Sequence, residues 1–441
     1  MGQQRRFLRA RRAFTATGDQ VVHDAVVQLD AERISGVFEA SEVDFGPDDE
    51  VEDFGDATML PGFVDAHVHV SLFGDGRSYE QMASDPDELM ALVAVENLRR
   101  HLANGVTTVR DNGGRNRVPF LVREAIQRGY LTGPRMLVSG RPLTMTGGHF
   151  HWCNGTADGP DAIRRAIRKL VTEGADHIKI MASGGATRGL PQYVVGYSVE
   201  ELRHAVETAH EHGKRTTAHA LGSTSMDYAI RAGLDCLEHA DFVVPPTEQS
   251  KAYGLPYDIE FDASLAQRLV ESGTYVSFTI QAGGYQTLVR LRQHEQEREL
   301  TDEEFRLKTR LRVRSEKKLD VFHRLLHAGM EPRLAVSTDA GPYVAQFGHF
   351  YLCLELAVEA GMTPEQAIIA ATSIPARSCG VADRVGSLEP GKEADVVVVG
   401  GDPLGDIRCV RDVRAVYLAG HRLSFPDPIT PGPLIPASPN V

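Results

Sequence analysis

The 441-residue chain is long enough to bury a large core, and its composition is that of an ordinary globular protein, which excludes a largely disordered chain. Its formal net charge of -13 argues against nucleic-acid binding through a general basic surface. No run approaches the roughly 18 apolar residues that a membrane span requires, so we expect a cytoplasmic protein with neither a nucleic-acid partner nor a membrane partner.

The first 60 residues alternate polar and apolar side chains over short segments, as in residues 20–29. A period of two is typical of antiparallel strands with one buried face. Residues 394–399 and 413–420 show the same strand-like texture near the other end of the chain, with Gly and Pro around them. We therefore predict that residues 1–60 and 376–441 fold together as one composite β-sandwich domain.

Between these ends, short apolar segments alternate with helical ones that have legible starts, such as the capping boxes that begin at Ser198 and Thr301. Eight strands alternating with helices over residues 61–375 favour the α/β class and a (β/α)8 TIM barrel, with an open doubly wound sheet as the alternative. The eight candidate strands are residues 62–70, 106–111, 135–140, 177–182, 215–219, 236–239, 275–279 and 333–337.

The charged segment 293–318 is longer than a simple connection between a strand and a helix. We interpret it as a helix preceded by a loop that overhangs the barrel mouth. The alternative is a solvated outer helix with many ion pairs.

Histidines close three of the candidate strands, and a barrel of this class carries its active site at the C-terminal ends of its strands. His67 and His69 end the first strand, where a spacing of two points both imidazoles to the same side. Paired neutral imidazoles suit zinc, iron, nickel or cobalt. His219 and His239 end the fifth and sixth strands, although each alone is more typical of a core or surface histidine.

Two further residues of metal-binding type close the fourth and eighth strands. Lys179 lies among apolar neighbours, where an unpaired ammonium is costly to bury. It is either paired with a carboxylate or snorkelling, or it has reacted with carbon dioxide to give a carbamate, whose two anionic oxygens can bridge two metal ions. Asp339 can bind a metal and accept a proton from a bound water. The joint pattern over five strand ends is poorly explained by chance.

The segment after the third strand, residues 147–154, carries the chain's single tryptophan, Trp152, between aromatic and histidine neighbours. We expect His149 to act in catalysis by contacting the substrate carbonyl or a substrate carboxylate, with an ordinary loop histidine as the alternative. His151 and Trp152 are candidates for the wall of the substrate pocket. Tyr193 and Tyr197 are candidate hydrogen-bond donors to a substrate carboxylate, although tyrosines at such positions are as often packing residues.

Taken together, these motifs resemble the amidohydrolase superfamily in its two-metal form with a bridging carboxylated lysine. The resemblance covers nearly the whole chain, and it is strongest to the branch of imidazolonepropionase-like enzymes that contains Xaa-Pro and Xaa-Arg dipeptidases. The segments that carry it are residues 61–69, 146–149, 177–185, 337–340 and 386–395.

The resemblance implies two divalent metal ions, for which we expect Zn2+, and self-association into a homo-oligomer. One ion would be held by His67, His69 and Asp339. The other would be held by His219 and His239, and a carbamate on Lys179 would bridge the two ions.

The leading functional prediction is a hydrolase that cleaves a C–N bond in a small amide, peptide, urea or carbamate through a hydroxide bridging the two metal ions. Asp339 would take the nucleophile's proton and pass it to the leaving amine. The best single expectation is a dipeptidase or amidase, with a xenobiotic amide, phenylurea or carbamate hydrolase and a cyclic amidohydrolase or lactonase as alternatives. Outside enzymes, the alternative is a non-catalytic assembly barrel.

Overall fold

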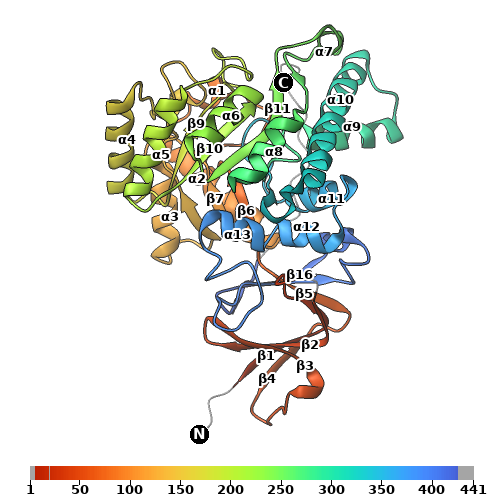
Figure 1. Ribbon diagram of the computed structural model, residues 1–441. Helices are drawn as coiled ribbons and strands as arrows, with labels where there is room; N and C mark the ends of the chain where they lie inside the picture. The colour runs from red at the N-terminus through yellow and green to blue at the C-terminus, as the bar shows by residue number, and fades with distance from the viewer. Residues whose placement is uncertain (1–4, 19, 426–441) are drawn as a thin grey trace.

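Strands from both ends of the chain form one eight-stranded sheet in the computed structural model, which describes residues 5–18 and 20–425. The strand order is β17-β16-β15-β5-β1-β2-β3, and β4 pairs with β1. Figure 1 shows β1 to β5 together with β16 at the lower end of the molecule. Its strands are β1 (Arg6–Phe14), β2 (Val21–Asp30), β3 (Arg33–Glu39), β4 (Glu50–Asp53), β5 (Ala57–Pro61), β15 (Val396–Gly400), β16 (Val413–Leu418) and β17 (His421–Arg422).

Antiparallel pairing of β15 with β5 brings the two ends of the described chain together. Side chains from both groups of strands share one apolar core, in which Val27 and Met59 lie with Val398 and Tyr417. The boundaries of the composite domain and its two-layer sandwich form stay predictions, and the predicted domain includes residues 1–4, 19 and 426–441, which lie outside the described residues.

All eight candidate strands of the central region are present and run parallel to their neighbours. They form two groups in chain order, β6-β7-β8 and β9-β10-β11-β13-β14, and a short antiparallel strand, β12 (Asp258–Ile259), that the sequence did not predict adds to β11. The eight strands are β6 (Phe63–Val68), β7 (Val106–Asp111), β8 (Arg135–Val138), β9 (His177–Met181), β10 (Arg215–Gly222), β11 (Cys236–Val244), β13 (Tyr275–Phe278) and β14 (Leu334–Val336). The fold class is therefore α/β, with mixed sheets.

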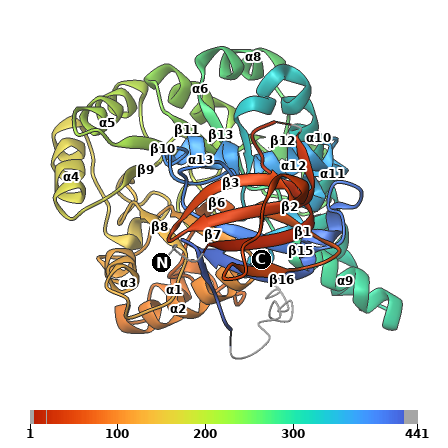
Figure 2. The same cartoon turned by 90° about the horizontal axis from the view of Figure 1, so that it is seen from below.

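Helices follow the strands of the central region in the chain. They surround these strands when the molecule is viewed from below (Figure 2). None of the helices in residues 5–18 and 20–425 is long and apolar enough to cross a membrane. The helices are α1 (Tyr79–Met82), α2 (Asp87–Ala103), α3 (Val118–Gln127), α4 (Pro160–Thr172), α5 (Val199–Glu211), α6 (Ser223–Ala232), α7 (Glu248–Ala252), α8 (Ala263–Ser272), α9 (Tyr285–Glu297), α10 (Asp302–Leu325), α11 (Tyr351–Glu359), α12 (Pro364–Ala370) and α13 (Ser373–Cys379).

The predicted capping boxes begin α5 and α10. Ser198 and Thr301 each accept a hydrogen bond from the backbone N–H three residues on, and the glutamate at that position accepts one in return. The interpretation of segment 293–318 needs correction, because its first residues complete α9 and the loop is confined to residues 298–301. Arg298 is extended there and pairs with Glu304 at 2.6 Å, so two helices meet at a short break.

The end of β6 and the residues after β14 lie side by side, which positions the candidate site. Single parallel bridges link Val68 to Ala340 and, at the other gap between the strand groups, Leu143 to Ile180. Beneath the first of these, buried Asp65 accepts a hydrogen bond from the Thr338 hydroxyl at 2.6 Å. Because two chain segments are tied here by backbone and side chain together, the residues that follow each strand are held rigidly.

Candidate metal centre and substrate cavity

Histidine and carboxylate side chains from the ends of separate strands meet at one point. His67 Nε2 lies 3.4 Å and His69 Nε2 lies 3.5 Å from Asp339 Oδ1. One ligand atom each from His67, His239 and Asp339 all lie within 4.8 Å of one another. His219 Nδ1 lies 2.8 Å from His239 Nε2. Strands β6, β10 and β11 and the segment after β14 therefore bring their histidine and carboxylate side chains to one rim, as the parallel arrangement predicts.

In two of these imidazoles, a hydrogen bond to a backbone carbonyl determines which ring nitrogen carries the proton. His69 Nδ1 lies 2.8 Å from the Gly113 carbonyl oxygen, and His219 Nε2 lies 3.1 Å from the Gly184 carbonyl oxygen. A carbonyl oxygen only accepts hydrogen bonds, so each of these nitrogens donates. The lone pairs therefore remain on His69 Nε2 and His219 Nδ1, the two atoms that face Asp339 and His239.

Burial favours the neutral form of the imidazoles in this cluster. It lowers the pKa of His69 and of His219 to about 3, and it lowers the pKa of His67 and His239 well below the ordinary value. Neutral imidazole is the form that binds metal ions. Two buried nitrogens here, His67 Nε2 and the Lys179 amine, also lack a hydrogen-bond partner among the described residues. Neutral imidazole nitrogens around a carboxylate form a ligand set that fits a bound cation.

Lys179 lies in the same cavity wall and is 1 % exposed. Burial lowers the pKa of its ammonium to about 8, so a substantial fraction of the neutral amine exists at mildly alkaline pH. Burial also raises the pKa of Asp339 to about 7. Asp339 has a positive φ of 56°, and its N–H donates to the His67 carbonyl oxygen at 2.9 Å, which fixes the carboxylate against the histidines.

Glu238 and Arg110 support the cluster from below, and neither was predicted from the sequence. Glu238 Oε2 lies 2.8 Å from His67 Nδ1, and Oε1 accepts a hydrogen bond from Arg110 at 2.9 Å. Both side chains are almost completely buried. The available signal was a glutamate inside an apolar strand, directly before the candidate ligand His239. A buried carboxylate needs partners, and His67 and Arg110 are two of those that Glu238 has.

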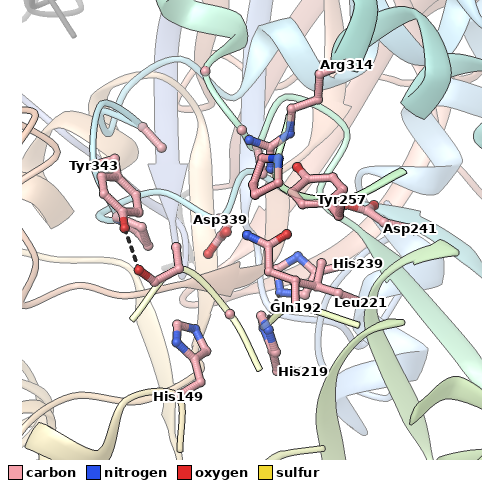
Figure 3. A pocket seen from close by; sticks show the side chains of 18 of the residues that line it. His149, Gln192, His219, Leu221, His239, Asp241, Tyr257, Arg314, Asp339 and Tyr343 are labelled. Carbon is pink, nitrogen blue, oxygen red and sulfur yellow. Dashed lines mark hydrogen bonds between the residues drawn. The ribbon is translucent and has the colours of Figure 1, made fainter. Parts of the chain in front are cut away.

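A cavity of about 630 Å³ opens above the cluster (Figure 3). Its apolar wall includes Tyr79, Phe150, Leu221 and Leu255. Three cationic residues of α10, Arg310, Arg314 and Lys318, also line it. The segment that we expected to overhang the site thus contributes to the cavity, but through the helix rather than through a loop.

Of the predicted substrate-binding residues, His149 and Tyr193 line the cavity. His149 Nδ1 lies 2.8 Å from the Thr187 hydroxyl, and its ring centroid lies 4.6 Å from that of His219. Figure 3 shows His149 beside His219 at one side of the cavity. A substrate held over the cluster would therefore meet the His149 ring.

The other three predicted substrate-binding residues do not line the cavity. His151 is exposed, and its Nδ1 lies 3.0 Å from the Gly148 carbonyl oxygen. Trp152 stacks on Phe150 with ring centroids 5.5 Å apart, so it supports the wall from behind. The Tyr197 hydroxyl donates to the Ala157 carbonyl oxygen at 2.8 Å, which is a packing role. The loop positions were identified from composition, which does not determine side-chain direction.

Residues 58–423 match the sequence model of the amidohydrolase family. The chain belongs to this family. It is 29% identical over 391 residues to ochratoxinase from Aspergillus niger, covering 81% of this chain and 73% of the relative. It is 25% identical over 374 residues to imidazolonepropionase from Erwinia tasmaniensis, covering 78% of this chain and 79% of that protein.

Among solved structures, a Xaa-Pro dipeptidase with methionine bound in its active site superposes with a TM-score of 0.79 at 27% identity, covering 96% of this chain and all of that chain. Phenylurea hydrolase B, at 21% identity and a TM-score of 0.78, shares the fold. This amidohydrolase is therefore an enzyme of the imidazolonepropionase and Xaa-Pro dipeptidase-like branch, a hydrolase that acts on C–N bonds of small molecules. The family generally uses a divalent metal, which agrees with the donor set described above.

Proposed function

We propose that this amidohydrolase cleaves the amide bond of dipeptides or N-acyl amino acids at a two-metal centre. His67, His69 and Asp339 would hold one Zn2+ ion, His219 and His239 the other, and a carbamate on Lys179 would bridge them. Residues 61–375 would form the (β/α)8 barrel around this centre. The observation that carries the proposal is a buried group of neutral imidazoles around the Asp339 carboxylate, in a cavity that is also lined by the Lys179 amine, which has no hydrogen-bond partner within the described part of the chain.

The carbamate follows from the chemistry of Lys179. Its neutral amine adds to carbon dioxide, a proton leaves, and the product is an anion with two oxygens where an amine stood. The lowered pKa provides the neutral amine that this addition needs. The anion would supply negative charge in a cluster that otherwise holds neutral imidazoles and few carboxylates.

Divalent ions held by these residues would lower the pKa of a water and polarise the substrate carbonyl. Asp339 reaches the cavity, where it can accept the proton of the attacking water and deliver it to the leaving nitrogen. His149, which lines the cavity, would donate a hydrogen bond to the substrate carbonyl or position a polar group of the substrate. The apolar wall excludes water from the rest of the substrate and orients it.

A substrate panel combined with chelation tests this function. We expect the protein to hydrolyse members of a panel of dipeptides, N-acyl amino acids, simple amides and aryl ureas. Removal of bound metal should reduce the rate at least about 100-fold, and added Zn2+ should restore it. Full activity in protein shown to be free of metal would contradict the proposal. Metal-loaded protein that cleaves nothing in the panel would favour an assembly role.

Glu238→Gln is expected to lower the affinity for metal roughly 10- to 100-fold, because residues that orient a metal-binding histidine have effects of this size. The glutamine oxygen can still accept from Arg110, but its NH2 group would face His67 Nδ1 and disfavour the protonation that leaves Nε2 free. Competition with a chromophoric chelator measures the affinity. Glu248→Gln, at a highly exposed ion pair with Lys251, is the matched control. Equal affinities in the two variants would remove Glu238 from this role.

A further inference from the structure

One face of α10 carries positive charge into the cavity, in a chain whose net charge is -13. Arg310, Arg314 and Lys318 are spaced by four residues, so they lie along the same side of the helix. Lys318 is neutralised by Asp241 at 3.0 Å, and both side chains are buried. The charge that this face presents to a ligand therefore comes from its arginines.

Arg314 is held in place without a counter-ion. Among the described residues, it makes no ion pair, and its buried Nε has no hydrogen-bond partner. Its guanidinium carbon lies 5.4 Å from the ring centroid of Tyr257. On another side it packs on Gly283, where a Cβ atom would lie 2.3 Å from the guanidinium carbon. A ring and a glycine thus position the group, while its buried Nε is left without an acceptor among the described residues.

The placement is electrostatically unfavourable without a ligand. Arg314 is half-buried beside a second arginine, and burial followed by the charge of Arg314 lowers the pKa of Arg310. A partly desolvated guanidinium loses hydration that only an anion or several acceptors can replace. Figure 3 places Arg314 across the cavity from His149, with Asp339 between them, so the group lies away from the reacting end.

We propose that Arg314 binds a carboxylate of the substrate at the end of the cavity remote from the metal centre, and so selects acidic amides over neutral ones. The planar guanidinium matches a carboxylate in a two-point contact. The aromatic and aliphatic wall would bind the apolar part of the substrate between the carboxylate and the scissile bond. This inference rests on the proposed amide hydrolysis for its place in the reaction, but the anion site can be measured without turnover.

The kinetic test compares two pairs of substrates in wild-type protein and in Arg314→Met. N-benzoylglycine and its carboxamide differ in a carboxylate on the amine side of the amide, and succinanilic acid and its carboxamide differ in one on the acyl side. In at least one pair, the variant should lose roughly 10- to 100-fold in kcat/KM for the acid, mainly through KM, and less than about threefold for the carboxamide. Equal loss for acid and carboxamide in both pairs, or no loss, would overturn the proposal.

A binding measurement separates this proposal from the proposed function. Calorimetry with metal-stripped protein should show that wild type binds at least one of the two acids more tightly than its carboxamide, and that Arg314→Met loses this difference. The control is Arg312→Met, which removes an exposed arginine of the same helix that pairs with Glu316 at 2.8 Å. If metal-loaded wild type cleaves none of the four compounds, amide hydrolysis fails while calorimetry still decides the anion site. Acids that bind wild type and Arg314→Met equally would overturn it.

Discussion

Asp339→Asn is expected to lower kcat/KM by about 10³-fold or more while the protein stays folded. Asparagine has the same shape as aspartate, but its amide cannot take the proton of the attacking water, and general base catalysis alone contributes roughly 10²- to 10⁴-fold. The substitution also removes an anionic ligand from the proposed metal centre. Steady-state kinetics on the best substrate of the panel measures the loss.

The fold should survive because asparagine tolerates the backbone geometry of this position. Residue 339 has a φ of 56°, a left-handed conformation that Asn adopts more readily than most residues. Its N–H, which donates to the His67 carbonyl oxygen, is unchanged. Asp320→Asn, at an exposed residue of α10, is the matched control and should retain full activity. Asp339→Asn protein that is well folded and keeps activity within tenfold of wild type would exclude Asp339 as the base.

Lys179→Met is expected to reduce kcat/KM by roughly 10³-fold, because it removes the proposed bridging anion and with it one metal ion, whose charge stabilisation is worth several kcal/mol. Methionine is similar to lysine in length and suits the buried site, so a large loss of stability is not expected. Carbon-13 NMR after reconstitution with labelled bicarbonate should show one carbamate signal in wild type and none in the variant.

Lys251→Met provides the control for this prediction, since Lys251 is exposed and forms an ion pair on α7. It should keep both the carbamate signal and the activity. Bicarbonate supplied during reconstitution should raise wild-type activity and leave Lys179→Met unchanged. A fully active, metal-loaded wild-type protein with no carbamate signal would show that Lys179 acts as an unmodified amine.

The eight central strands could be predicted because each is a short apolar run followed by a turn or a helix start. The convergence of His67, His69, Lys179, His219, His239 and Asp339 on one rim could be predicted for a related reason. Neighbouring parallel strands end on the same side, so residues that close separate strands meet even when they are distant in the chain. Ser198 and Thr301 identified helix starts because a capping box depends only on local hydrogen bonds.

The rest depended on side-chain directions that no local pattern encodes. Arg314 lies in a charged segment whose composition indicates a solvent-exposed helix, yet one face of α10 lines the cavity. The role of Glu238 could not be predicted because His67 and Arg110, the residues that connect it to the cluster, come from other strands. Tyr197 and His151 were expected in the cavity wall but do not line it. Loop residues have no fixed alternation between inside and outside, so the sequence does not determine which way their side chains point.

The metal content of the purified chain tests the central claim most directly. Elemental analysis after exhaustive dialysis should find two divalent ions per wild-type chain, and His67→Ala and His219→Ala, which remove one ligand from each proposed ion site, should each retain clearly less. A wild-type chain that hydrolyses its substrate with no stoichiometric metal, or two variants that bind as much metal as wild type, would contradict the account.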